Sequence, residues 1–257
     1  MKSTTDMGRL LVMAGLLVGM PASAATITIA ADEWCPYNCE PGSDKPGYMI
    51  EIAQKVFGEA GHTIEYQTMP WSRAIEEARR GRFSAIVGAT ARDAPDFDYP
   101  SRSLGVGVNV FLTAKGSDWR FSDIGSLATV SLGTIRDYSY GDALDAYIAQ
   151  HGRDAARVQV ASGDTALDIN FKKLAAGRIG ALVEDRNVAE YYLANSSQQG
   201  GFDTVGDLGE NPLHIAFSPA IENGAEYARL VAEGVQKMRA SGELATLLTK
   251  YGLQDWE

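Results

Sequence analysis

The sequence predicts an α/β fold of two lobes joined by two extended segments, and three observations support this prediction. Strand-like and helix-like segments alternate over 26–87. The alternation restarts and continues over 129–183. Two further extended stretches surround Val110 and Leu213, where the chain would cross between the two regions. Alternating strands and helices form layered α/β structures, so we expect each region to be one lobe.

The first lobe is expected to begin with a strand at 26–30, in which apolar and polar residues alternate. A loop rich in proline and glycine follows at 32–47 and contains Trp34. An amphipathic helix at 48–57 should end at Gly58, because glycine commonly terminates helices.

The next segment, TMPWSRAIEEARRGRFSAIVGATARD at 68–93, predicts a strand end, a helix and a buried strand. Apolar residues recur at helical spacing from Trp71 to Ala78, and Gly81 supplies a stop. A short strand is expected at 85–87. Ligands of open α/β sheets bind outside the carboxyl ends of the strands, so the turns that follow these strands are candidate sites.

Four residues of this lobe follow strands and become candidates for binding: Trp34, Trp71, Gly88 and Thr90. Tryptophan is more often a core residue than a ligand clamp, but both tryptophans lie in loops beside prolines. Thr90 could instead cap a turn.

The second lobe is expected to contain strands at 129–135, 158–160 and 179–183. A helix containing Leu144 should lie between the first two strands, and a helix at 165–176 should precede the third. The chain should then return to the first lobe through an extended stretch at 213–217 and two helices at 226–239 and 243–251. We therefore expect four parts, namely 1–24, lobe one at 25–112, lobe two at 113–208, and a return segment of lobe one at 209–257.

Polar side chains also follow the strands of the second lobe. Tyr138 and Ser139 lie at an expected helix start, where Ser139 and Asp142 form a weak capping box. Glu184 and Asp185 come directly after the last strand. Asp185 could instead cap the helix that follows it.

Composition and motifs argue against several functional classes. The chain has 257 residues, 45% of them hydrophobic, and a formal net charge of −10, so nucleic acid is not expected as a partner. It contains no phosphate-binding loop with Lys-Ser/Thr, no nucleophile elbow and no HExxH motif. His62, His151 and His214 are far apart in the sequence. We therefore predict no catalytic residue, no metal site and no cofactor.

The N-terminus is typical of a secretory signal peptide. Lys2 and Arg9 precede an apolar run at 10–20, and Pro21-Ala22-Ser23-Ala24 provides a small-residue cleavage pattern after Ala24. A membrane anchor is the alternative, but the run is shorter than the roughly 20 residues that a spanning helix needs. We expect a cleaved leader at 1–24 and export of the mature protein.

The two cysteines, Cys35 and Cys39, lie in the sequence WCPYNC. In an exported protein such a close pair favours a disulfide over a metal site, because no histidine lies nearby. Two free thiols are the alternative. We expect the disulfide to fix the loop of Trp34.

Six segments, in this order, resemble one family: ADEWCPY, PGYMIEIAQKVF, TMPWSRAIEEARRGRFSAIVGAT, SLGTIRDYSYG, GRIGALVEDRNVAEYYL and LVAEGVQKMRASGELATLLTKYGL. Their order and spacing are similar to those of periplasmic solute-binding proteins of polar amino acid ABC transporters, the bacterial extracellular solute-binding proteins of family 3. The resemblance implies a type II periplasmic-binding-protein fold, in which two lobes joined by two hinge strands close on a ligand. It also implies a small-molecule ligand and an ABC permease in the inner membrane as partners, and we expect a monomer.

The resemblance also assigns roles to the candidate residues. Trp34 and Trp71 match aromatic residues that sandwich the ligand. Gly88, Thr90, Tyr138 and Ser139 match groups that meet an amino acid carboxylate, consistent with anion binding at helix N-termini. Asp185 matches the aspartate that pairs with the ligand's ammonium group, and Glu184 is placed to contact a ligand side chain.

One position departs from the family pattern. The arginine that clamps the ligand carboxylate is replaced by Pro95, and Arg92 or Arg136 could serve instead. A ligand without a standard carboxylate is equally compatible with this change.

Two other functions remain open. A dehydratase of cyclic acids on the same scaffold could recruit Glu33, Glu184 or Asp185 as a general acid. A sensory module that reports to a receptor is the other alternative.

Overall fold

The structure is a computed structural model that describes residues 24–257, and its first lobe is built from both ends of this range. The predicted leader therefore lies, apart from Ala24, outside the described residues. The elements of the first lobe are β1 (Thr26–Ala31), α1 (Tyr48–Glu59), β2 (Thr63–Thr68), α2 (Trp71–Arg79), β3 (Ala85–Ala89), α6 (Gly224–Ser241) and α7 (Glu243–Lys250).

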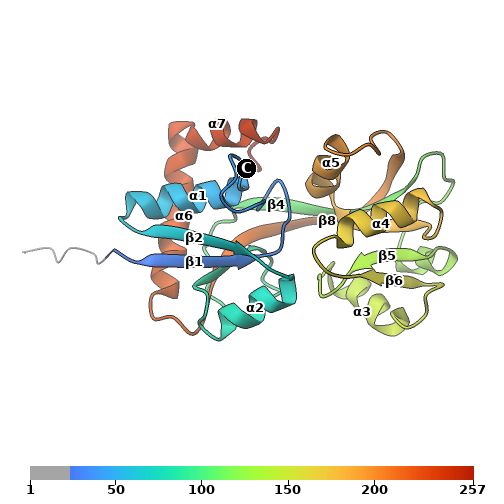
Figure 1. Cartoon of the computed structure of the whole chain (residues 1–257), viewed down its shortest axis with the longest axis horizontal. Coiled ribbons are helices and arrows are strands. Elements are labelled where there is room, and N and C mark those ends of the chain that lie inside the picture. Colours follow the sequence, from blue (N-terminus) through green and yellow to red (C-terminus); the bar gives the residue numbers. More distant parts are fainter. Residues whose placement is uncertain (1–23) are drawn as a thin grey trace, which may run out of the picture.

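The second lobe is formed by the middle of the chain (Figure 1). Its elements are a 3-10 helix η1 (Ile124–Thr129), then β5 (Leu132–Ile135), α3 (Asp142–His151), β6 (Val158–Ala161), α4 (Ala166–Ala175), β7 (Ala181–Asp185) and α5 (Arg186–Ala194). Two long strands, β4 (Gly105–Ala114) and β8 (Phe202–Phe217), run between the lobes.

All the strands belong to one eight-stranded sheet of order β2-β1-β3-β8-β4-β7-β5-β6. In the first lobe, β1 lies parallel to β2 and to β3, and β3 pairs antiparallel with β8 at Ile86 and Ala216. In the second lobe, β4 pairs antiparallel with β7 at Val110 and Glu184. Since β4 also pairs with β8, these two strands connect both lobes. The predicted fold of two α/β lobes joined by two strands is confirmed, whereas the residue boundaries of the lobes stay a prediction.

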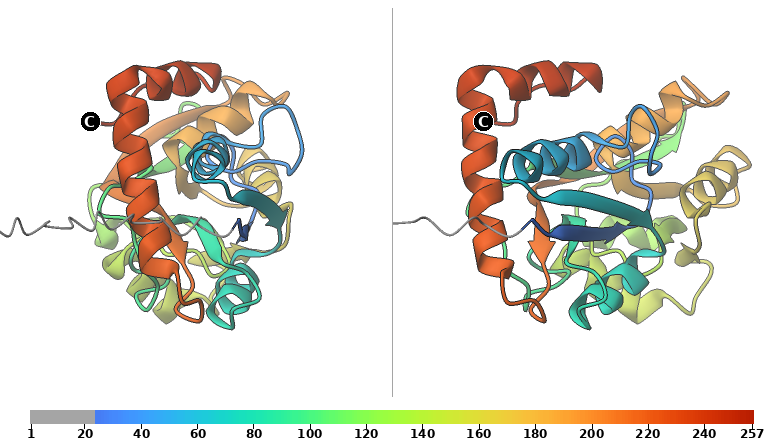
Figure 2. Two further views of the ribbon diagram at one scale, coloured as in Figure 1. Left: turned by 90° about the vertical axis from the view of Figure 1, so that its left-hand side faces the viewer. Right: turned by 60° about the vertical axis from the view of Figure 1, so that its left-hand side comes forward.

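Each lobe has its own hydrophobic core. The larger core packs Ile29 of β1, Phe57 of α1, Phe217 of β8 and Val231 of α6, all fully buried. Figure 2 shows α6 as a long helix along the side of this lobe, beside α1 and followed by α7. In the second lobe, one cluster forms around Phe111 and Leu132 and another around Phe171 and Leu182. Separate cores allow each lobe to remain rigid while the connecting strands bend.

Several element boundaries differ from the predictions in the first lobe. Helix α1 continues through Gly58 to Glu59, and Gly61 rather than Gly58 adopts the left-handed conformation, with φ of 83°. Strand β3 extends to Ala89, so Gly88 lies inside it rather than after it. The register against β8 shifts at this point and Gly88 has φ of 81°, as expected for a glycine at a β-bulge.

The second lobe also departs from the predictions. Strand β5 begins at Leu132, because the preceding residues form η1, whose start is capped by the Asp123 carboxylate. Helix α3 begins at Asp142, and its N-cap residue, Gly141, provides no side-chain hydrogen bond. The capping box predicted for Ser139 and Asp142 is therefore wrong.

Two strands are longer than expected. Strand β7 continues to Asp185, so Glu184 is part of the strand. Strand β8 begins at Phe202, not near Leu213, because its first half pairs with β4 in the second lobe. Within 24–257, no helix combines the length and the apolar composition that a membrane span requires.

Candidate functional site

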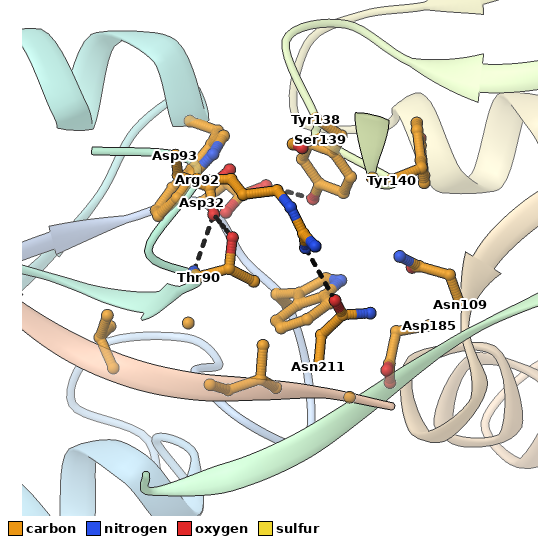
Figure 3. A pocket seen from close by; sticks show the side chains of 17 residues that line it. Asp32, Thr90, Arg92, Asp93, Asn109, Tyr138, Ser139, Tyr140, Asp185 and Asn211 are labelled. Carbon is orange, nitrogen blue, oxygen red and sulfur yellow. Dashed lines mark hydrogen bonds between the residues drawn. The ribbon is translucent and has the colours of Figure 1, made fainter. Parts of the chain in front are cut away.

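A cleft lies between the lobes, with walls from both of them (Figure 3). It comprises about 620 Å³ of space, part of it open to solvent. Eight predicted site residues line it: Trp34, Trp71, Gly88, Thr90, Arg92, Tyr138, Ser139 and Asp185. Residues distant in the sequence thus converge because the carboxyl ends of β1, β3 and β7 face the same gap.

The loop after β1 positions Trp34. Its backbone N–H donates to the carbonyl of Asn38 at 2.7 Å, and a disulfide joins Cys35 to Cys39 across the same turn. The Trp34 ring stacks on Tyr37 with centroids 4.5 Å apart. The disulfide prediction is borne out, and the turn holds the indole at the edge of the cleft.

Trp71 occupies the first position of α2, shortly after the end of β2. It is only 7% exposed and packs against the core of the first lobe while also lining the cleft. The two alternatives for this tryptophan, core residue and cleft wall, therefore both describe it.

Glu184 lies behind the cleft wall and connects the lobes. Its Oε1 accepts hydrogen bonds from the Trp34 indole at 3.1 Å and from the Asp185 backbone N–H at 2.8 Å. Its Oε2 has no hydrogen-bond partner within 24–257. Burial raises the pKa of this carboxyl to about 8, so Glu184 is mostly protonated at neutral pH. It is not among the residues that line the cleft.

Asp185 both lines the cleft and caps a helix. Its Oδ1 accepts from the backbone N–H groups of Asn187 at 2.9 Å and Val188 at 3.2 Å, which fixes the start of α5. The same oxygen accepts from the Tyr37 hydroxyl at 3.0 Å, and Oδ2 accepts from the Val108 N–H at 2.8 Å. Burial raises the pKa of Asp185 to about 6 in spite of these donors.

Thr90 is bonded to a carboxylate of the chain itself. Its backbone N–H and its hydroxyl each donate to Asp93 Oδ2 at 2.7 Å. The Thr90 hydroxyl therefore donates to Asp93 rather than accepting a backbone N–H, as a turn cap would. Burial raises the pKa of Asp93, and Asp93 lines the cleft.

The two predicted arginines occupy different places. Arg92 lines the cleft, donates from Nη1 to Asn211 Oδ1 at 3.0 Å and places Nε 3.4 Å from the Asp142 carboxylate of the other lobe. Figure 3 shows its side chain directed toward Asn211. Arg136 does not line this cleft but an adjoining hollow, which shares Asp32, Trp71 and Tyr138 with it.

The lobe-two turn contributes Tyr138, Ser139 and Tyr140. The Tyr138 hydroxyl donates to Asp32 of the first lobe, which adds another contact between the lobes. The Ser139 hydroxyl and the Tyr140 N–H both donate to Asp145, at 2.6 and 2.8 Å. These donors precede α3 rather than forming its first turn, because the helix begins at Asp142.

Sequence reasoning missed several residues that line the cleft: Asp32, Asp93, Asn109, Tyr140 and Asn211. Asp32 directly follows β1, so the rule that selected Trp34 could have found it. Burial raises the pKa of Asp32 to about 6. Asn109 and Asn211 lie on the connecting strands, for which the predicted pattern gave no sign of contact with a ligand.

The cleft is predominantly acidic. Asp32, Asp93 and Asp185 line it, and of the described residues in its walls Arg92 alone is cationic. No group of three or more His, Cys, Asp or Glu residues within the described range is placed to hold a metal ion. The arrangement offers carboxylates, amides and aromatic faces, which can bind a small polar molecule.

Comparisons with known proteins agree with this architecture. A search of curated protein sequences finds no match. Among solved structures, the chain is similar to a protein from a study of glutathione import via GshT and the cystine ABC importer TcyBC of Streptococcus mutans. The TM-score is 0.73 at 17% identity, covering 90% of this chain and 97% of that one.

Two further structures share the fold. A histidine kinase sensor domain similar to periplasmic binding proteins matches with a TM-score of 0.71 at 19% identity, covering 90% of this chain and 98% of that one. A mutant of the arginine-binding protein ArgBP from T. maritima matches with a TM-score of 0.70 at 16% identity, covering 89% and 95%. At these identities the likeness concerns the fold alone.

The family model of the bacterial extracellular solute-binding proteins, family 3, matches residues 27–254. This range contains both lobes, both connecting strands and every residue of the cleft. The chain belongs to the bacterial extracellular solute-binding proteins, family 3.

Proposed function

We propose that this protein is the substrate-binding component of an ABC importer, which captures a small polar solute and delivers it to a permease in the inner membrane. The solute would be an amino acid or a related compound bearing an amine. The leader at 1–24 would direct the protein to the periplasm, where it acts as a monomer.

The observation that best supports this proposal is that side chains from both lobes form one cleft and bond directly across it. Trp34 and Asp32 of the first lobe contact Glu184 and Tyr138 of the second. A ligand that contacts both walls favours the closed arrangement, because its binding energy is realised only when the lobes meet.

Specific roles follow from the positions of the side chains. Trp34 and Trp71 would flank the solute with their indole faces, and Asp185 would face its ammonium group. The amides of Asn109 and Asn211 would complete the polar contacts from the connecting strands.

The geometry of the cleft gives little support to the dehydratase alternative. It requires a general acid beside the substrate. Of the acids proposed for it, Glu184 is hydrogen bonded to Trp34 and does not line the cleft, whereas Asp185 lines the cleft but already accepts from the backbone N–H groups of Val108, Asn187 and Val188. The sensory alternative is supported by the fold that this chain shares with the histidine kinase sensor domain. A sensory module would require the same ligand-binding cleft.

The proposal can be tested by ligand screening followed by scattering. A thermal-shift screen over amino acids, amines and small peptides should find compounds that raise the melting temperature, since a ligand stabilises the state that binds it. Small-angle X-ray scattering should then show a smaller radius of gyration with each such compound. Trp71→Ala should abolish both effects, whereas Trp119→Phe, in the second lobe outside the cleft, should retain them. Compounds that bind the Trp71→Ala variant equally well would contradict the proposal.

A further inference from the structure

The charge of the cleft indicates which class of solute it accepts. Asp32 and Asp93 lie on the first-lobe wall, and Asp185 lies on the other side of the opening (Figure 3). Their nearest cationic neighbour among the described wall residues, Arg92, has a side chain 51% exposed and already faces Asn211 and Asp142. If the cleft closed without a ligand, or on an anionic ligand, its carboxylates would come together with no positive charge to offset their repulsion.

Two residues that were expected to meet a ligand carboxylate, Thr90 and Ser139, donate instead to aspartates of the chain itself. In the first lobe, both donors of Thr90 point to Asp93 Oδ2, each at 2.7 Å. In the second lobe, the donors of Ser139 and Tyr140 point to Asp145, at 2.6 and 2.8 Å. Asp93 and Asp145 thus take the hydrogen bonds that Thr90, Ser139 and Tyr140 could otherwise donate to an anionic ligand.

One acceptor, by contrast, lies next to the cleft wall without a partner among the described residues. Asn38 is 1% exposed, and its Oδ1 has no hydrogen-bond partner in the described part of the chain. It faces Gly88 of the cleft wall, where a Cβ would lie 3.1 Å from it. Asn38 is not among the residues that line the cleft, so this acceptor lies behind the wall.

Aromatic side chains complete the walls. Trp34, Trp71, Tyr138 and Tyr140 all line the same space. Aromatic faces attract cations, and this attraction strengthens when water is excluded. Their apolar surface would also cover the methylene groups of a small alkylamine.

We propose that the solute is a small organic cation without a carboxylate, an amine or diamine, bound between the cleft carboxylates and the aromatic faces. This inference rests on the proposed function and specifies its ligand. It requires that removal of a carboxylate from an α-amino acid improves binding.

Matched pairs of compounds that differ only by that carboxylate provide the test. The pairs are putrescine and ornithine, cadaverine and lysine, agmatine and arginine, and tyramine and tyrosine. Calorimetry on the purified protein should show that at least one amine binds at least 100-fold more tightly than its amino acid. An amino acid that binds as tightly as its amine, or a set in which no amine binds, would overturn the inference.

Two variants that change the charge of the cleft in opposite directions provide a second test. Asp93→Asn retains an oxygen for the Thr90 donors but removes one negative charge, so amine affinity should fall at least tenfold. Arg92→Ala removes a like charge, so amine binding should tighten, whereas a carboxylate ligand would lose a partner and bind more weakly. Asp96→Asn, an exposed acid paired with Arg79, is the control and should change affinity less than twofold. Thermal unfolding of each variant verifies that it is folded.

These outcomes separate the two proposals. If amino acids bind better than amines and compact the protein, the inference about the ligand fails and the transport function stands. If no compound in either set compacts the protein, and the wider screen gives none that does, the proposed function fails as well.

Discussion

The indole Nε1 of Trp34 lies 3.1 Å from Oε1 of Glu184, which joins a loop of the first lobe to a strand of the second. Trp34 lines the cleft, and Glu184 lies behind it, 1% exposed. The same tryptophan can therefore contact a ligand with its face and the opposite lobe with its N–H group. The hydrogen bond between Trp34 and Glu184 thus links a residue of the ligand cleft to the contact between the lobes.

Trp34→Phe should weaken ligand binding by roughly 5- to 10-fold. Phenylalanine keeps an aromatic face but removes the N–H donor, and a net hydrogen bond contributes about 1 kcal/mol. Calorimetry with any solute found by screening measures the change. Trp119→Phe is a matched control, because it removes an indole donor to the Ser126 carbonyl outside the cleft. Equal affinities for the two variants would show that the contact between the lobes does not stabilise closure.

The buried carboxyls predict that the ligand-free protein loses stability as the pH rises. Burial raises the pKa of Glu184 to about 8 and the pKa values of Asp32 and Asp185 to about 6. In the unfolded chain, carboxyls lose their protons near pH 4. The folded state therefore binds more protons between about pH 4 and 8, and the free energy of unfolding should fall across this window. Each carboxyl that keeps its proton only in the folded state lowers the free energy of unfolding by at most about 1.4 kcal/mol per pH unit.

Glu184→Gln should flatten this dependence between about pH 5 and 8, because the amide resembles the protonated carboxyl and does not titrate. Urea denaturation at a series of pH values measures the slope. Glu190→Gln, at an exposed position of α5, serves as the control. A Glu184→Gln variant with the wild-type slope would mean that Glu184 does not titrate differently in the folded state.

Substitution of two helical glycines by alanine should change the stability of the protein in opposite directions. In α6, a Cβ on Gly234 would lie 2.3 Å from Cγ2 of Val56, a buried residue of α1. Overpacking of this kind costs about 1–3 kcal/mol, which exceeds the gain in helix propensity. Gly58 in α1 has no atom within 4 Å of such a Cβ, so Gly58→Ala should stabilise by up to about 1 kcal/mol.

Denaturation of the two alanine variants measures these changes. Val56→Ala should partly restore the Gly234→Ala variant, because it removes both methyl groups that meet the new Cβ. If Gly234→Ala is as stable as the wild type, α1 and α6 must separate more easily than their buried contact indicates.

The alternation of strands and helices was sufficient to predict the two-lobed fold, because hydrophobic periodicity is a local property. The predicted ends of the helices and strands are wrong where tertiary contacts determine them. The first half of β8 has weak strand character in the sequence and forms because β4 lies beside it. Similarly, Gly88 lies within β3 because a bulge accommodates its positive φ.

The candidate site was predicted from strand ends, and this rule found residues from both lobes. It could not show how their hydrogen bonds are distributed. The sequence gives no sign that Thr90 bonds to Asp93 or that Asp185 bonds to Tyr37, since these depend on side-chain orientation and on the meeting of the lobes. Similarly, the sequence does not show that Arg136 lines a hollow beside the cleft rather than the cleft itself, and its role in binding stays a prediction.

Asp185 should contribute to both stability and binding, and two substitutions separate these contributions. Asp185→Ala removes the cap of α5 and leaves the Tyr37 hydroxyl and the Val108 N–H without an acceptor. Loss of a cap costs about 1 kcal/mol, and each buried donor left unpaired adds about 1–3 kcal/mol. The free energy of unfolding should therefore fall by about 2 kcal/mol or more.

Asp185→Asn retains an acceptor oxygen and the shape of the side chain, so it should destabilise much less than Asp185→Ala. It removes the negative charge, however, and should still weaken the binding of a cationic solute by at least tenfold. Urea denaturation and calorimetry on both variants measure the two effects. If Asp185→Asn binds the solute as tightly as the wild type, the aspartate serves only to cap α5 and to hold Tyr37, and the ligand's ammonium group must lie against Asp32 or Asp93 instead.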